Sequence, residues 1–197
     1  MILMEKETLL ISREKYLSAG VHIGMTFKTS DMKRFIYKVR PNGIAVLNIG
    51  MLDERIKFVS QILAKKERIL IVARRDSAKQ AVQKFCEVVN SNSILGRFMP
   101  GSLTNPTYNE FTEPEVLIVV DPLTEKQAIT EATHMRIPII GFADTSNETS
   151  YLDVVLPANN KAKKSIALIF WLLAKEIMKN RGKEEEFKYE PKDFGYE

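Results

Sequence analysis

The feature that most limits how this chain can fold is a set of short, almost uninterrupted apolar runs separated by helical patterns. The runs read "ILIVA" at 69–73, "EVLIVV" at 115–120 and "IPIIGFA" at 137–143. A strand that is apolar on both sides is buried on both faces, which is typical of a parallel sheet covered by helices. The sequence therefore predicts an α/β fold in three layers, with helices on both faces of a mainly parallel sheet.

Helical patterns surround these runs. We expect helices from Ser12 to about Gly20 and over 53–65, 76–89, 125–135 and 161–181, with short strands at 93–95 and 151–157. With 197 residues and 45% hydrophobic content, the chain can bury one sizeable core. We therefore expect residues 1–182 to form a single α/β domain and residues 183–197 to form a charged tail.

A β-hairpin is predicted near the N-terminus. The runs "FIYKV" at 35–39 and "IAVLN" at 44–48 flank "RPNG". Asn42 and Gly43 supply the positive φ angles that a tight hairpin turn requires. On such a strand Phe35 and Tyr37 would share one face.

Several classes of protein are excluded by what the sequence lacks. One thiol, Cys86, gives no disulfide framework and no paired-cysteine metal site, which fits a reducing compartment. The longest apolar run, 166–174, is too short to span a membrane, and the N-terminus shows no signal-peptide pattern. No glycine-rich phosphate motif occurs in the chain. We expect a soluble cytoplasmic protein with no cofactor, no membrane partner and no small-molecule substrate.

Two acidic residues leave an alternative open. Asp121 and Asp144 end successive strands, where two carboxylates could hold Mg²⁺ or act as acid and base. The same residues are common turn formers and helix caps. A small metal-dependent α/β enzyme or a receiver-like domain is therefore a second hypothesis, although a receiver needs an acidic pair where this chain has Arg74-Arg75. His22, in a glycine-lined turn, is interpreted as a packing or RNA-contact residue.

Charge is distributed unevenly along the chain. Residues 1–112 hold 18 Lys and Arg against 10 Asp and Glu, while residues 113–197 hold 11 against 15. Cations alternate with Phe27, Phe35 and Tyr37 in "MTFKTSDMKRFIYKVR", a pattern expected of a surface that neutralises phosphates and stacks bases. The predicted RNA-binding cations are Lys28, Lys33, Arg34, Lys38 and Arg40.

The loop "GRFMPGSLTNPTYN" at 96–109 is a second candidate RNA contact. Glycines allow backbone to approach a phosphate closely, and prolines stiffen the loop. The residues that would contact phosphate or sugar are Arg97, Gly101, Ser102, Thr104 and Asn105. An ordered connector at the carboxyl edge of the sheet is the alternative interpretation.

Many separated motifs occur together in register. They include "YLSAGVHIGM", "RPNGIAVLN", "PGSLTNP", "EVLIVVDP" and "NNKAKKSIALIFWLLAKEI". Over residues 9–182 the chain resembles the S-two family of small-subunit ribosomal proteins, in its archaeal branch. The long coiled-coil insertion that marks the bacterial branch is absent after the hairpin. Ala158 stands where the archaeal and eukaryotic pattern often has Cys, and "NIGML" at 48–52 stands where a basic residue is usual.

The resemblance implies a flavodoxin-like structural constituent of the small ribosomal subunit, active in translation. It would bind ribosomal RNA and neighbouring ribosomal proteins near the junction of head and body. The tail 183–197 has three Lys against six acids, which disfavours RNA. Acidic segments with aromatic anchors suit a basic protein partner, so the tail is predicted to make that contact. Its candidate contact residues are Phe187, Tyr189, Phe194 and Tyr196.

Overall fold

The chain, described by a computed structural model over residues 9–196, is built on a five-stranded parallel sheet. Its strands, in chain order, are β3 (Ile69–Ala73), β4 (Asn92–Leu95), β5 (Val116–Val119), β6 (Ile139–Ala143) and β7 (Val154–Pro157). They lie in the order β4-β3-β5-β6-β7, and every neighbouring pair is parallel. This is the flavodoxin-like doubly wound order. The predicted parallel sheet is confirmed.

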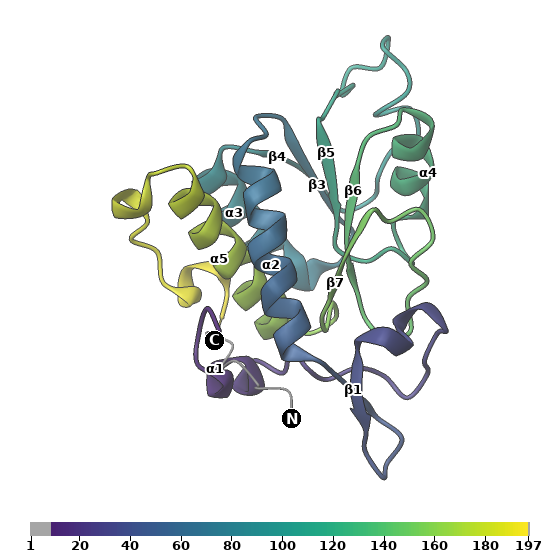
Figure 1. Cartoon of the computed structure of the whole chain (residues 1–197). Coiled ribbons are helices and arrows are strands. Elements are labelled where there is room, and N and C mark those ends of the chain that lie inside the picture. The colour runs from purple at the N-terminus through teal and green to yellow at the C-terminus, as the bar shows by residue number, and fades with distance from the viewer. Residues whose placement is uncertain (1–8, 197) are drawn as a thin grey trace.

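Helices cover both faces of this sheet. One face carries α2 (Ile49–Ala64), α3 (Asp76–Val89) and α5 (Lys163–Asn180), and the other carries α4 (Lys126–His134) (Figure 1). The larger core lies between the sheet and helices α2, α3 and α5, where Phe170 packs edge-on against Phe85. The predicted three-layer fold is thus confirmed. Among the described helices, none is long and apolar enough to cross a membrane.

The crossover from β4 to β5 is a loop instead of a helix. Gly96 N–H donates to the Ala73 carbonyl at 2.9 Å near the carboxyl edge, whereas Glu115 N–H donates to Arg68 near the amino edge. Phe98 and Leu103 are 7% and 1% exposed and belong to the core on the α4 side of the sheet. The loop therefore crosses the sheet face and fills the place that a crossover helix would take.

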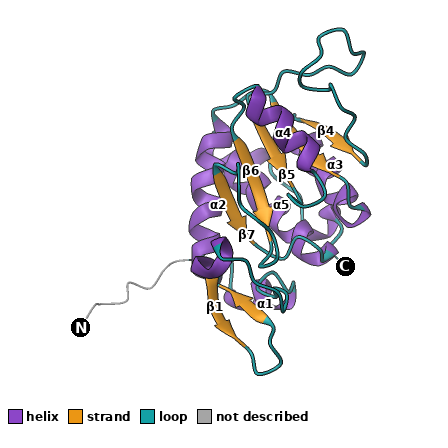
Figure 2. Cartoon of the chain, turned by 90° about the vertical axis from the view of Figure 1, so that its right-hand side faces the viewer, coloured by secondary structure: helices purple, strands orange, loops and turns teal. Residues whose placement is uncertain are grey.

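The N-terminal elements lie at one end of the sheet and pack against it and α2. These are α1 (Arg13–Ser18), the 3₁₀ helix η1 (Asp31–Phe35), and the antiparallel strands β1 (Ile36–Val39) and β2 (Ala45–Leu47). Figure 2 shows the hairpin projecting beyond the layers. Its turn differs from the prediction, because Gly43 has φ of 81° and Asn42 does not have positive φ. Gly43 N–H donates to the Arg40 carbonyl at 2.9 Å, so a four-residue turn with Pro41 at its second position closes the hairpin.

Helix α2 starts four residues earlier than expected. Asn48 caps it by accepting a hydrogen bond from Gly50 N–H at 3.0 Å. The prediction of a start near Asp53 was wrong because Gly50 and the short apolar run beside it obscured this cap. Strand β2 ends at Leu47, so a single residue connects the hairpin to α2, with no coiled-coil insertion between them.

The C-terminal tail folds back onto the domain. It contains the 3₁₀ helices η2 (Glu184–Glu186) and η3 (Pro191–Phe194). Phe194 has no exposed side-chain surface and lies in the larger core. Trp171 Nε1 donates to the Tyr189 carbonyl at 2.9 Å. The tail thus packs on the same core as α3 and α5.

Candidate nucleic-acid interface

The two strand-end aspartates are buried and paired with cations. Asp121 and Asp144 are each 1% exposed. Arg75 Nε donates to Asp121 Oδ2 at 2.8 Å, and Lys161 Nζ lies 3.3 Å from Asp144 Oδ2. Each carboxylate therefore has its negative charge compensated inside the protein.

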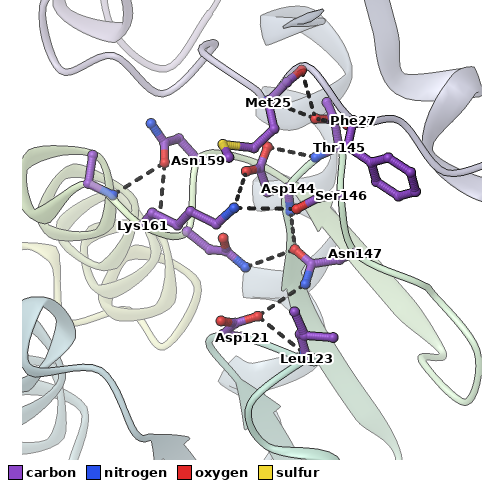
Figure 3. A network of polar contacts seen from close by, with 12 residues as sticks. Met25, Phe27, Asp121, Leu123, Asp144, Thr145, Ser146, Asn147, Asn159 and Lys161 are labelled. Carbon is purple, nitrogen blue, oxygen red and sulfur yellow. Dashed lines mark hydrogen bonds and ion pairs between the residues drawn. The ribbon is translucent and has the colours of Figure 1, made fainter. Parts of the chain in front are cut away.

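Asn147 connects these two ion pairs. Its Nδ2 donates to Asp121 Oδ1 at 3.0 Å, while its Oδ1 accepts from Asp144 N–H at 2.8 Å and from Asn160 Nδ2 at 3.1 Å (Figure 3). Residues that follow β5, β6 and β7 are thereby held in one polar network. Such a network fixes the loops at the carboxyl edge because buried polar groups from three loops satisfy one another, although Asn160 Oδ1 has no partner within residues 9–196.

Glu125 joins the same network at the carboxyl ends of β3 and β5. Its carboxylate accepts hydrogen bonds from the Arg74 and Asp121 N–H groups at 2.9 and 3.1 Å. Burial raises the pKa of Glu125 to about 8, against the lowering effect of those hydrogen bonds. This acid therefore serves to satisfy buried backbone donors.

This arrangement closes the place where doubly wound sheets usually bind ligands. That place is the carboxyl edge at the switch in strand order, here between β3 and β5. Arg75, which follows β3, reaches across it to Asp121, which follows β5. Within residues 9–196 no cluster of three or more His, Cys, Asp or Glu side chains could hold a metal ion. The two aspartates therefore act as structural groups.

The N-terminal segment crosses the same edge and is fixed there by Thr145. Thr145 Oγ1 accepts from Met25 N–H at 2.8 Å (Figure 3). Thr29 N–H donates to the Thr145 carbonyl at 3.0 Å. A Cβ atom on Gly24 would lie 2.5 Å from Thr145 Cγ2. The sequence thus needs glycine where this segment approaches the β6 loop closely.

We call residues 25–40 the basic arm. Of its five predicted RNA-binding cations, Lys28 is half-buried and Lys33, Arg34, Lys38 and Arg40 are exposed. Within residues 9–196 none of the five forms an ion pair. The arm therefore presents cations to solvent, in contrast to the paired cations at the sheet edge.

The aromatic residues of the basic arm do not all lie on one surface. Phe27 and Tyr37 are 67% and 63% exposed, whereas Phe35 is fully buried beneath the guanidinium groups of Arg34 and Arg55. The prediction that Phe35 and Tyr37 share a face was wrong. Phe35 belongs to η1, and the register shifts between Ile36 and Lys38.

The loop 96–109 directs much of its polarity inward. Gly101 N–H and Leu103 N–H donate to the two carboxylate oxygens of Glu131 at 2.8 and 3.2 Å. Ser102 is 2% exposed, and its hydroxyl donates to Met99. Although burial acts to raise the pKa of Glu131, hydrogen bonds starting with that from Gln127 hold it below the ordinary value.

The predicted loop contacts therefore divide into two groups. Gly101 and Ser102 serve the internal structure of the loop, while Arg97, Thr104 and Asn105 are exposed. Thr104 Oγ1 also donates to Glu131 Oε2 at 3.3 Å, and Asn105 Oδ1 accepts from Thr107, so Arg97 is the freest of the three. Glu131 was not singled out from the sequence, because nothing local links a helical glutamate to a loop 30 residues earlier.

The four tail aromatics are likewise unequally available. Phe194 is buried, Phe187 lies 6.3 Å from the Trp171 ring centre, and Tyr196 Oη lies 3.1 Å from Ser18 Oγ. Tyr189 is 37% exposed with Lys84 Nζ over its ring. Tyr189 is thus the tail ring that retains most surface for a partner.

The two histidines differ in their surroundings. His22 is 7% exposed, two residues after Gly20 with its positive φ of 69°, and His134 ends α4 on the surface. Burial, followed by the charge of Arg40, lowers the pKa of His22. The imidazole is therefore neutral at neutral pH.

These features define a flavodoxin-like α/β protein whose usual ligand edge is filled by its own ion pairs and whose N-terminal arm carries five cations that form no ion pair within residues 9–196. The chain belongs to the ribosomal protein S2 family, whose model matches residues 16–112 and 107–180. It is similar to the small ribosomal subunit protein uS2 of Methanococcus maripaludis strain C6, with 44% identity over 181 residues. The match covers 91% of this chain and 82% of the relative.

A second relative, the protein of the same name from Methanococcus maripaludis strain C5, is 45% identical over the same shares of both chains. The archaeal-type membership inferred from the separated motifs is therefore confirmed. The chain is a ribosomal protein and not an enzyme.

Proposed function

We propose that the chain is a structural constituent of the small ribosomal subunit that binds ribosomal RNA through the basic arm. The observation that carries this proposal is the set of exposed cations on the arm that lack ion-pair partners within residues 9–196. RNA phosphates would neutralise these cations, and the release of counterions from the RNA would supply much of the binding affinity. The names of the two uS2 relatives support this assignment.

The fixed position of the arm favours such docking. Because Thr145 holds Met25 and Thr29 by hydrogen bonds, the arm loses little conformational freedom when it binds. Arg97, Thr104 and Asn105 are proposed as further phosphate or sugar contacts, since they remain exposed on an ordered loop. The basic arm and these residues would set the orientation of the protein on the RNA.

Neighbouring ribosomal proteins are the second proposed class of partner. The tail combines carboxylates with the partly exposed Tyr189, so we place a protein contact there. The docking site lies near the junction of head and body in this proposal, and the protein acts in the cytoplasm during translation.

Sedimentation of native extract tests the proposed function. The chain should run with the small subunit at moderate salt and be released as the salt concentration rises, because phosphate contacts weaken with salt. A fully ribosome-free protein at moderate salt contradicts the proposal. A variant with Asp76 and Glu87, both exposed on α3, changed to Asn and Gln serves as a control that should sediment like the wild type.

A further inference from the structure

A groove of about 600 Å³ lies between α1, the β1–β2 hairpin and the start of α2. Arg13, Lys38 and Arg40 contribute its cations, and its described lining includes no carboxylate. Its volume falls within the range of pockets that hold small ligands. The groove is therefore a positively charged site large enough for a planar organic group.

A β-bulge places an aromatic ring and a cation on the same groove. Ile36 pairs with Leu47 and Lys38 pairs with Val46, so Tyr37 is the extra residue on its strand. In a regular strand neighbouring side chains point to opposite faces, whereas a bulge redirects one of them. Tyr37 and Lys38 both line the groove as a result, and the Tyr37 side chain is 63% exposed.

The start of α2 forms part of the groove wall. Asn48, Ile49 and Gly50, at the start of α2, line it, and the first turn of this 16-residue helix contains no acidic residue. The positive end of the helix dipole is therefore not neutralised locally. His22 also lines the groove, but its Nδ1, which has no hydrogen-bond partner within residues 9–196, is buried by the protein. The helix end and the three cations therefore supply the positive character of the groove.

We propose that this groove binds one unstacked nucleotide of an RNA strand, with its base against Tyr37 and its phosphates near Arg13, Lys38 and Arg40. The proposal rests on the RNA-binding role proposed above and gives that role a specific subsite. Single-stranded nucleotides are recognised by the same combination of stacking and backbone neutralisation. Arg13 and His22 lie outside the basic arm, so the groove is more than an extension of it.

The lining favours a nucleotide over an acidic peptide. A peptide carboxylate would use the cations but would leave the exposed ring of Tyr37 without a planar partner. A phosphate alone would use neither the ring nor most of the volume. A nucleotide uses the ring, the cations and the volume together.

Binding of short oligomers to the full chain tests the groove. The probes are a fluorescent adenosine hexaribonucleotide, an abasic hexamer with the same phosphates, and a hexaglutamate peptide, compared by anisotropy at one salt concentration. Tyr37→Leu removes the ring, and Tyr151→Leu is its control, since Tyr151 is 72% exposed and does not line the groove. Arg13→Gln is paired with Lys15→Gln, which changes an exposed cation of the same helix that does not line it.

The expected result is a preference for the adenosine hexamer over both other probes. Tyr37→Leu should weaken hexamer binding roughly 5- to 150-fold, the range of base–aromatic stacking, and should leave abasic binding unchanged. Arg13→Gln should weaken binding of both nucleic acid probes, while the two controls should not. Equal binding of adenosine and abasic hexamers, or of hexaglutamate, would overturn the proposal, as would a neutral Tyr37→Leu or Arg13→Gln.

Sedimentation separates this proposal from the ribosomal role. If the chain runs with subunits but the hexamer results contradict the groove, the subsite is wrong and the ribosomal role stands. If the groove binds the hexamer as described but the native chain runs free of subunits, the ribosomal role fails and the nucleotide site stands.

Discussion

Asn147 Nδ2 donates a hydrogen bond to Asp121 Oδ1 at 3.0 Å and so ties the loop after β6 to the loop after β5. The same Asp121 receives the Arg75 guanidinium at the switch in strand order. Doubly wound folds commonly hold ligands at this edge, whereas here the Asp121 carboxylate connects loops of the protein itself. The partners of this protein must therefore be sought on other surfaces, above all on the basic arm.

The first prediction concerns Asp121→Asn. The variant should lose about 1–3 kcal/mol of unfolding free energy, because Arg75 and Asn147 lose a charged acceptor in a buried place. Chemical denaturation measures this loss. Asp76→Asn, with an 88% exposed carboxylate, is the control and should change stability little.

The same variant decides between a structural and a metal-binding role. Under the structural role, Mg²⁺ should not raise the melting temperature of the wild-type chain, because no binding energy is linked to folding. A Mg²⁺-dependent rise that Asp121→Asn abolishes would contradict this assignment.

The second prediction concerns Glu131→Gln. The amide NH₂ cannot accept hydrogen bonds, so one of the Gly101 and Leu103 N–H groups would lose its acceptor. We expect a loss of about 1–3 kcal/mol, together with faster hydrogen exchange in residues 99–105. Glu113→Gln, at an exposed position, is the control. Unchanged exchange in Glu131→Gln would show that the carboxylate does not hold the loop.

A pH dependence follows from the same contact. The folded-state pKa of Glu131 lies below its ordinary value of 4.5, so its stabilising effect is fully present above pH 4.5. It is lost as the pH falls through the lowered folded-state pKa. Hydrogen exchange of Gly101 and Leu103 should therefore gain protection from this contact as the pH rises from below the lowered folded-state pKa to 4.5, with no further gain above it, and Glu131→Gln should lack that gain.

The third prediction concerns the tail. Phe194→Ala should lower the unfolding free energy by about 3–5 kcal/mol, because a fully buried aromatic ring leaves a cavity. Tyr189→Ala, at the exposed end of the aromatic cluster, should cost much less. Similar losses for both variants, measured by chemical denaturation, would contradict the packing described here.

The tail contacts also determine what truncation of the tail should do. Removing residues 183–197 would uncover core surface around Phe194, so it should destabilise the domain in addition to weakening any protein contact. A partner assay on the truncated chain alone therefore cannot isolate that contact. Tyr189→Ala tests it with less disturbance.

Local sequence patterns predicted the elements well where a single strong signal was present. The strand 69–73 and the helix 76–89 have the bounds expected from their apolar run and apolar period. The start of α2 was missed, because Asn48 and Gly50 resemble a loop unless the cap is recognised. Phe35 was assigned to a strand because a 3₁₀ turn leading into a bulge leaves no clear period.

The candidate sites were predicted by residue type but not by geometry. The pairing of Arg75 with Asp121 spans 46 positions, and that of Gly101 with Glu131 spans 30, so spacing along the chain cannot reveal them. The Tyr37 bulge is similarly a result of tertiary packing. Sequence patterns thus located the basic arm, while the groove behind it became recognisable from the fold alone.

The last prediction concerns the salt dependence of RNA binding. If Lys28 and Lys33 neutralise phosphates, Lys28→Gln with Lys33→Gln should weaken binding of a small-subunit RNA fragment and reduce the slope of log affinity against log salt by about 0.7 for each lost single-strand contact. The control pair Lys65→Gln with Lys126→Gln removes equal charge from exposed positions away from the arm. Since both pairs lower the net charge equally, a nonspecific effect would change both slopes alike. A slope that falls in the arm variant and not in the control assigns the phosphate contacts to the arm, and equal slopes in both variants would remove that assignment.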